Sequence, residues 1–279
     1  MGINLYHDAG APPPIRDHGL MHPSRSDVGG PASADEVADG PAAQPHRFPR
    51  VTSFRTRRST LSPAQQETWD RLWPELGLQA RDDNSRPIVD LDTTAWFGRS
   101  APVILEIGSG TGTSTLAMAQ AEPDLDVIAV EVYRKGLAQL LSAIDRTAQT
   151  TNPVTNIRLV RGDGVDVLEH MFGSETLTGV RVFFPDPWPK ARHHKRRLLQ
   201  PATVALIADR LRPGGILHAA TDHSGYAEHI AEVGDAEPRL RRVSPGADLP
   251  ISTERPVTKY ERKALAGPDV TELVWEKRP

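Results

Sequence analysis

The chain contains no cysteine and no long apolar run. Without cysteine, disulfide bridges, thiolate zinc sites, iron–sulfur clusters and cysteine nucleophiles are excluded, and a chain of this kind suits a reducing cytoplasm. No segment approaches the ~20 consecutive apolar residues of a membrane-spanning helix. The first residues lack the basic and apolar regions of a signal peptide. We therefore expect a cytoplasmic protein without a membrane partner.

Apolar residues are also somewhat scarce, at 38% of the 279 residues. Residues 1–46 hold few large apolar residues and show no periodicity, and they contain seven prolines, six glycines and six acidic against two basic side chains. Such a segment buries too little apolar surface to offset the entropy lost on ordering, so we expect a disordered tail. Residues 47–279 carry a nearly balanced charge, and we expect them to form a single domain.

Residues 47–100 are expected to form a helical and basic lead-in to that domain. Ser62 and Pro63 are typical of a helix start, and Gly77 of a helix end. Between them Trp69 and Trp73 stand at helical spacing with leucines. We interpret both tryptophans as core contacts rather than as platforms on which bases stack.

From residue 101 to residue 235 the sequence alternates between apolar strands and amphipathic helices. The predicted strands are 103–107, 127–132, 157–160, 180–184 and 216–221. Continuous apolar strands alternating with helices indicate a parallel sheet covered on both faces. Residues 236–279 add two extended segments, 240–243 and 271–275, which we expect to pair antiparallel at the sheet edge. The prediction is a seven-stranded, doubly wound α/β sheet, mostly parallel, with an antiparallel edge strand.

A carboxylate stands at or just after the end of each of the five predicted strands. These residues are Glu106, Glu131, Asp163, Asp186 and Asp222. In a doubly wound sheet the ligand binds outside the carboxyl ends of the strands. Five carboxylates at one rim therefore predict a cleft that binds a ligand through its hydroxyl and amino groups.

The glycine loop after the first of these strands discriminates between cofactors. The dinucleotide-binding pattern requires a glycine where this chain has Thr113. Glycines stand instead at Gly108, Gly110 and Gly112, a spacing that resembles the S-adenosylmethionine loop of class I methyltransferases. That cofactor has no pyrophosphate and needs close backbone approach, which glycine permits. Glu131 can accept its ribose hydroxyls, and Asp163 can stand near its adenine amino group.

The stretch after the fourth strand is the most unusual part of the sequence. Residues 183–190 hold three prolines in five positions, which excludes a helix or a central strand and predicts a rigid loop at the rim. Five lysines and arginines fall within residues 190–197, and beside such a loop we expect them to contact phosphates. His193 and His194 have no third ligand at metal spacing, so we predict no metal.

Together these motifs resemble the bacterial tRNA (guanine-N7)-methyltransferases, which modify guanine 46 of the variable loop. The matching pieces are 105–108, 183–197, 220–223, 226–229, 258–261 and the basic residues around Arg55, so the resemblance covers about residues 50–279. It implies a Rossmann-like class I methyltransferase fold, S-adenosylmethionine as cofactor and tRNA as partner. The chain departs from the family pattern at Ser109, where relatives often have a bulkier residue and no effect on activity is expected. It also departs at Pro189 and His194, which bears only on fine substrate geometry.

The resemblance also implies roles for individual residues. Asp186 is the expected catalytic residue. The expected cofactor-binding residues are Glu106, Gly108, Gly110, Gly112, Glu131, Asp163 and Asp186. The expected substrate-binding residues are Lys190, Asp222, Thr258, Lys259, Tyr260 and Glu261. The expected RNA-binding residues are Arg192, His193, His194, Lys195, Arg196 and Arg197.

Three other functions are weighed against this one. The stretch from Pro185 to Trp188 is faintly similar to the loop of enzymes that methylate exocyclic amines, which makes another nucleic-acid methyltransferase the main alternative. A nucleic-acid-binding module with a vestigial cofactor pocket is disfavoured by the intact set of rim carboxylates. A nicotinamide oxidoreductase is the weakest alternative, because the third glycine is misplaced.

Overall fold

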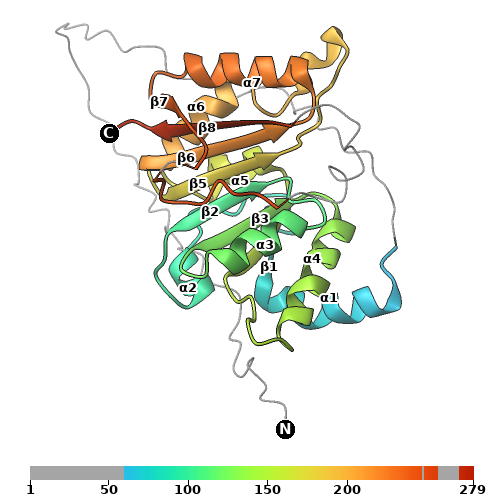
Figure 1. Ribbon diagram of the computed structural model, residues 1–279. Coiled ribbons are helices and arrows are strands. Elements are labelled where there is room, and N and C mark those ends of the chain that lie inside the picture. The colour runs from blue at the N-terminus through green and yellow to red at the C-terminus, as the bar shows by residue number, and fades with distance from the viewer. Residues whose placement is uncertain (1–59, 247, 257–269) are drawn as a thin grey trace, which may run out of the picture.

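A computed structural model describes residues 60–246, 248–256 and 270–279. Eight strands form one sheet in the order β1-β4-β3-β2-β5-β6-β8-β7, and helices pack on both of its faces (Figure 1). The strands are β1 (Gly77–Gln79), β2 (Val103–Ile107), β3 (Asp126–Glu131), β4 (Ile157–Arg161), β5 (Leu177–Phe183), β6 (Leu211–Thr221), β7 (Leu240–Val243) and β8 (Thr271–Lys277). The helices are α1 (Pro63–Leu76), α2 (Thr93–Phe97), α3 (Thr113–Ala121), α4 (Arg134–Thr147), α5 (Gly164–His170), α6 (Pro201–Arg210) and α7 (Ser224–Ala236), with a 3-10 helix, η1 (Ala191–Arg196).

The predicted α/β doubly wound architecture is confirmed. β1 to β6 are mutually parallel, and β8 pairs antiparallel with β6 on one side and with β7 on the other. The predicted antiparallel pair is therefore present, but β8 is the second strand from the edge and β7 forms the edge itself.

Two details of the strand prediction are wrong. The sheet has eight strands rather than seven, because Gly77–Gln79 continues from the end of α1 and pairs with β4. Three residues are too few to show a strand periodicity in the sequence. The fifth predicted strand begins earlier, at Leu211, because Leu211 pairs with Leu177 before the register shifts. That irregularity accommodates Pro213, which cannot donate to the ladder.

The start of α1 forms as predicted. The Ser62 side chain accepts a hydrogen bond from the backbone of Gln65 at 3.3 Å, and the Gln65 side chain accepts one from the backbone of Ser62 at 3.1 Å. Pro63 follows at the first helical position. Trp69 is buried and stacks on Trp73, with ring centroids 4.1 Å apart, which supports their interpretation as core contacts.

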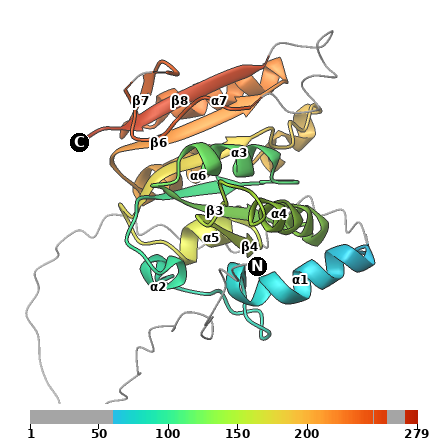
Figure 2. The same ribbon diagram turned by 60° about the horizontal axis from the view of Figure 1, so that its bottom comes forward.

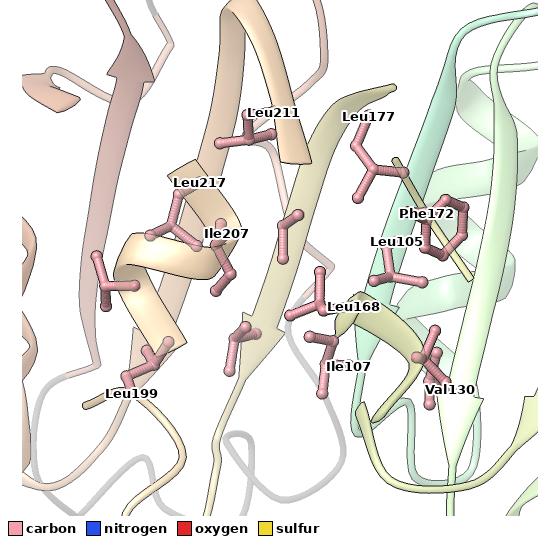
Figure 3. Close-up of a cluster of buried hydrophobic side chains, with 14 of the residues drawn as sticks. Leu105, Ile107, Val130, Leu168, Phe172, Leu177, Leu199, Ile207, Leu211 and Leu217 are labelled. Carbon is pink, nitrogen blue, oxygen red and sulfur yellow. The ribbon is translucent and has the colours of Figure 1, made fainter. Parts of the chain in front are cut away.

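Two apolar layers separate the sheet from its helices. On one face α1, α3 and α4 pack against the strands, and on the other α2, α5, α6 and α7 do so (Figure 2). Figure 3 shows the second layer, in which Leu168 of α5 and Ile207 of α6 lie over side chains from β2, β5 and β6. No helix among the described residues is long and apolar enough to cross a bilayer.

Residues 1–59 lie outside the described part of the chain. The expected tail and the basic residues around Arg55 therefore stay predictions, as does the division of the chain into tail, lead-in, core and extension.

Candidate active site

The predicted rim carboxylates lie at the carboxyl ends of the parallel strands. β2 lies between β3 and β5, where the strand order reverses, and the crevice beyond their carboxyl ends is where such sheets bind ligands. Glu106 and Glu131 belong to β2 and β3, and Asp163 follows β4. Asp186 follows β5, and Asp222 follows β6. The topology therefore places five residues that are far apart in the sequence along one rim of the sheet.

The glycine loop wraps around the Glu131 carboxylate. Gly110 donates its backbone N–H to Glu131 Oε2 at 2.9 Å, while Val132 and Tyr133 donate theirs to Oε1 at 2.7 and 2.9 Å. Gly110 has a φ of 58°, a conformation that L side chains rarely adopt. Burial raises the pKa of Glu131, and the Asp186 carboxylate raises it further against the opposing backbone bonds. A hydroxyl donor from a ligand would stabilise its ionised form.

Close packing fixes the position of this loop. A Cβ on Gly136 of α4 would stand 2.2 Å from the carbonyl oxygen of Gly110, and one on Gly112 would stand 2.5 Å from Leu140. Helix α4 therefore supports the loop from behind, and only glycine at 136 leaves room for it.

Glu106 is fully enclosed beneath the loop. Its Oε1 accepts a hydrogen bond from Thr115 of α3 at 2.9 Å, whereas Oε2 has no partner within the described part of the chain. The Ser109 hydroxyl is likewise buried without a described partner. Burial raises the pKa of Glu106, opposed by the charge of Arg181. Buried polar atoms without partners indicate a site for a ligand that carries its own donors, such as an ammonium group.

Asp163 has a structural task at the same edge. Its Oδ1 caps α5 by accepting the backbone N–H of Val165 at 2.8 Å and of Asp166 at 3.4 Å. The side chain is half-buried, so this cap leaves room for contact with a ligand.

Asp186 stands on a strained loop. Phe184 before it and Trp188 after it have φ angles of 50° and 44°, in the left-handed region that bulky residues rarely adopt. The backbone N–H of Phe184 donates to the carbonyl of Ala220 at 2.8 Å, which holds the start of the loop against the end of β6. Asp186 is exposed on this loop. The prediction of an irregular loop is therefore confirmed, while its rigidity stays a prediction.

The basic run forms the 3-10 helix η1, which the sequence analysis did not predict. Arg192, Lys195 and Arg196 are exposed, and Lys190 is exposed just before the helix. The Arg196 guanidinium lies 5.0 Å from the centre of the Trp188 ring, which His193 meets edge-on at 5.6 Å. Desolvation and the surrounding cations lower the pKa of His193. The helix therefore presents a concentrated positive charge beside the Asp186 loop.

Arg197 differs from the other predicted RNA-binding residues, because it is buried. Its guanidinium donates to the carbonyls of Pro187 at 2.9 Å and Gly225 at 3.3 Å, and its Nη2 lies 3.1 Å from His194 Nε2. The group also lies over the Tyr226 ring at 4.8 Å. Arg197 therefore joins the Asp186 loop, η1 and the start of α7. The burial of Arg197 could not be predicted from the sequence, because nothing in a run of basic residues distinguishes a buried arginine from exposed ones.

The residues expected to contact the substrate are only partly placed. Asp222 is exposed just before α7, beside His223, whose ring accepts the backbone N–H of Tyr226 at 3.2 Å. Burial raises the pKa of Tyr226 to about 12, and its hydroxyl accepts the backbone N–H of Leu199 at 3.2 Å. The expected substrate residues 258–261 lie outside the described part of the chain.

A possible cation site lies elsewhere on the molecule, although the sequence analysis predicts no metal. Side chains of Asp166, Glu169 and His170 come within 4.8 Å of one another. Asp166, however, accepts two hydrogen bonds from Arg81, at 2.6 and 2.8 Å. With a charge partner already present, this cluster gives no reason to assign a metal, and the absence of one stays a prediction.

Comparison with known proteins identifies the family of this chain. A family model described as "Putative methyltransferase" matches residues 100–272. A tRNA (guanine-N(7)-)-methyltransferase of Mycolicibacterium gilvum is 75% identical over 95% of this chain and 100% of its own length. One from Mycolicibacterium vanbaalenii is 72% identical over 94% and 99%, and one from Mycobacterium tuberculosis is 68% identical over 81% and 85%. The chain belongs to the tRNA (guanine-N7)-methyltransferase family, whose members use S-adenosylmethionine.

Proposed function

We propose that this chain transfers a methyl group from S-adenosylmethionine to N7 of a guanine in tRNA, at position 46 of the variable loop, in the cytoplasm. The observation that carries the proposal is the placement of Asp186. Its loop stands at the strand-order reversal beside the glycine loop, and its charge reaches the buried Glu131. A reacting base held by the Asp186 loop would therefore meet the cofactor at the rim.

The cofactor fits the residues around the glycine loop. Glu131 is the acceptor for the ribose hydroxyls, and the unpartnered Glu106 Oε2 suits the cofactor's ammonium group. Asp163 would accept from the adenine amino group or lie near it. When bound, S-adenosylmethionine supplies an electrophilic methyl group on a positively charged sulfur.

The methyl transfer needs no general base. Guanine N7 is an in-plane acceptor without a proton at neutral pH, so no side chain has to remove one. The protein's contribution is to hold N7 in line with the methyl group, and such alignment can be worth several kcal/mol. Methylation leaves positive charge on the guanine. The Asp186 carboxylate would stabilise that charge as it develops, without taking a proton.

The exposed cations of η1 would hold the RNA. The exposed side chains of Arg192, Lys195 and Arg196 on η1, with Lys190 just before it, would contact phosphates of the RNA backbone. Asp222 would accept from the Watson–Crick edge of guanine, where adenine presents a different pattern. Residues 258–261 would complete the substrate contacts. A single exposed base in a folded RNA suits such a compact basic surface better than a regular duplex.

The direct test is incubation of the purified protein with labelled methyl donor and unmodified tRNA, followed by nucleoside analysis. We expect N7-methylguanosine, and RNA that becomes cleavable after borohydride and aniline treatment. The matched control is a tRNA transcript with adenosine at position 46, which we expect to stay unlabelled. A label on an exocyclic amine would replace the proposal with its main alternative. Cofactor binding without any methylation would favour a binding module.

A further inference from the structure

A buried charged cluster lies under the Asp186 loop on the α3 face of the sheet. β2, β5 and β6 place Glu106, Arg181 and His218 side by side in register. The His218 side chain is fully buried, and its Nε2 lies 2.9 Å from Glu272 Oε2 on β8. Of these four side chains, only Glu106 has a part in the proposed chemistry. The presence of the other three therefore needs another explanation.

Arg255 connects this cluster to the Asp186 loop. Its side chain is only 3% exposed, and its Nη2 donates to Glu272 Oε1 at 3.1 Å. The same guanidinium lies 4.9 Å from the ring centre of Phe184 and 5.6 Å from that of Phe183. His218 meets the Phe183 ring edge-on at 4.9 Å. The two residues that begin the Asp186 loop are therefore packed against an arginine that β8 holds by charge.

The segment that carries Arg255 is itself clamped. Glu122, just after α3, accepts the backbone N–H of Ser252 at 2.6 Å, while Arg181 donates to the carbonyl of Ser252 at 3.1 Å. Arg181 and Glu122 also pair with each other at 2.6 Å. The backbone N–H and the carbonyl of Ser252 are thus both fixed by a buried ion pair. This fixes the entry of the segment three residues before Arg255.

Phe184 needs such support because of its backbone. A φ of 50° is unfavourable for an aromatic residue, because its Cβ crowds the backbone in the left-handed region. A cation held over the ring stabilises this conformation relative to the extended alternatives, since the ring would leave the guanidinium if the backbone relaxed. Asp186 is only two residues further on, so its position depends on the conformation of Phe184.

We infer that Arg255 is a positioning residue, which holds the Asp186 loop in its left-handed conformation by lying on Phe184 while Glu272 anchors it. The inference concerns how the site is held in place, and its link to catalysis rests on the proposed function. The contacts described above join Arg255 to the start of the Asp186 loop and to β8. Its loss would therefore impair turnover more than binding.

Hydrogen exchange tests the inference without any reference to methylation. In Arg255→Gln we expect faster exchange of the Phe184 amide, which is bonded to Ala220 in the wild-type chain. The matched control is Arg242→Gln. Arg242 also lies over an aromatic ring, that of Trp275 at 5.3 Å, and pairs with a carboxylate, Asp235 at 2.8 Å, but it stands on the edge strand β7. Unchanged exchange at Phe184 in Arg255→Gln, or an equal change in the control, would overturn the inference.

Kinetics then separate positioning from simple destabilisation. For Arg255→Gln we expect kcat to fall by about tenfold to a hundredfold, as small misplacements of reacting groups do. The dissociation constant for the cofactor should stay within about twofold, and Arg255→Lys, which keeps the charge, should recover part of the loss. Glu272→Gln should reduce kcat as well, and the double variant should be little worse than Arg255→Gln alone. Equal losses in kcat and cofactor affinity would contradict the positioning role. A wild-type chain that methylates no tRNA would instead count against the proposed function and leave the exchange result standing.

Discussion

Asp186 carries the clearest prediction among single residues. Its carboxylate is expected to act through charge, so Asp186→Asn keeps the shape and the hydrogen-bond acceptor but removes the stabilisation of the cationic product. We expect kcat to fall by about 10²–10³-fold with little change in the KM for tRNA. Steady-state kinetics with labelled methyl donor measures both constants.

Asp124→Asn is the matched control for this variant. Asp124 is an exposed aspartate in the turn between α3 and β3. It precedes β3 and therefore lies at the amino ends of the strands, whereas the rim lies at their carboxyl ends. We expect its kcat to equal that of the wild-type chain. Near-normal turnover by Asp186→Asn would show that the carboxylate charge has no part in the reaction.

Glu131 gives the site a pH dependence. Burial raises its pKa above the ordinary value of 4.5, so the folded chain holds the proton at a pH where the unfolded chain has released it. Between these two pKa values the folded state binds more protons, so this group's contribution to stability decreases as the pH rises. The ionised form is the stronger acceptor for the ribose hydroxyls, because both of its oxygens can accept and neither carries a proton. Cofactor affinity should therefore decrease as the pH falls towards the raised pKa.

Calorimetric titration of the cofactor between pH 5 and pH 8 measures this slope. In Glu131→Gln we expect weaker binding at every pH and a shallower slope, with the remaining slope due to Glu106, whose pKa is also raised by burial. Identical slopes for the variant and the wild-type chain would mean that another group controls the titration.

At the scale of elements, η1 and the residue that directly follows it contain two kinds of arginine. Arg192 and Arg196 are exposed and Arg197 is buried, although the three stand close together in the sequence. We expect Arg192→Glu and Arg196→Glu each to weaken tRNA binding and to lower the slope of log affinity against log salt by about one. Cofactor affinity and thermal stability should be unchanged. Filter binding at several salt concentrations measures the slope.

Arg212→Glu and Arg197→Gln serve as the two comparisons. Arg212 is exposed near the start of β6, so it lies at the amino ends of the strands, away from the rim. Reversing its charge should therefore leave the salt slope unchanged. Arg197→Gln should instead reduce stability, because it leaves the carbonyls of Pro187 and Gly225 without their donor. If Arg197→Gln altered only the salt slope, its placement as an internal support would be wrong.

The elements themselves were largely predictable from local signals. Ser62 and Pro63 fixed the start of α1, and continuous apolar runs located β2 to β6, because burial on both faces leaves a simple pattern. β1 and η1 were missed, since three strand residues and six 3-10 residues are too short for a period. The shift at Leu177 in β5 depends on pairing between distant residues, which no local pattern records.

For the whole molecule, the sequence predicted the rim but not what lies beneath it. Glu131 and Asp186 could be found because parallel strands end at one edge. Arg255 could not, because its partners Phe184 and Glu272 come from two other parts of the chain. The same holds for Arg181, a charged residue in an otherwise apolar strand. A single charged residue in a buried strand nevertheless indicates that another part of the chain supplies a residue of opposite charge.

The position of β8 makes the last described residues central to the whole fold. β8 pairs with β6 and β7, so the sheet is complete only when this strand is in place. Trp275 on β8 is fully buried, its Nε1 donates to Asp235 at 2.9 Å, and its ring fills the space that a Cβ on Gly234 would need. Trp275→Ala should therefore lower the free energy of unfolding by about 3–5 kcal/mol.

Trp73→Ala is the matched substitution, because Trp73 on α1 is only half-buried and should cost less. Urea unfolding followed by far-ultraviolet circular dichroism measures both variants without relying on tryptophan emission. Since Glu272 on the same strand anchors Arg255, we also expect Trp275→Ala to accelerate exchange at Phe184, which Trp73→Ala should not do. Equal losses of stability in the two variants, with Phe184 unaffected in both, would show that the rim is independent of the C-terminal strand.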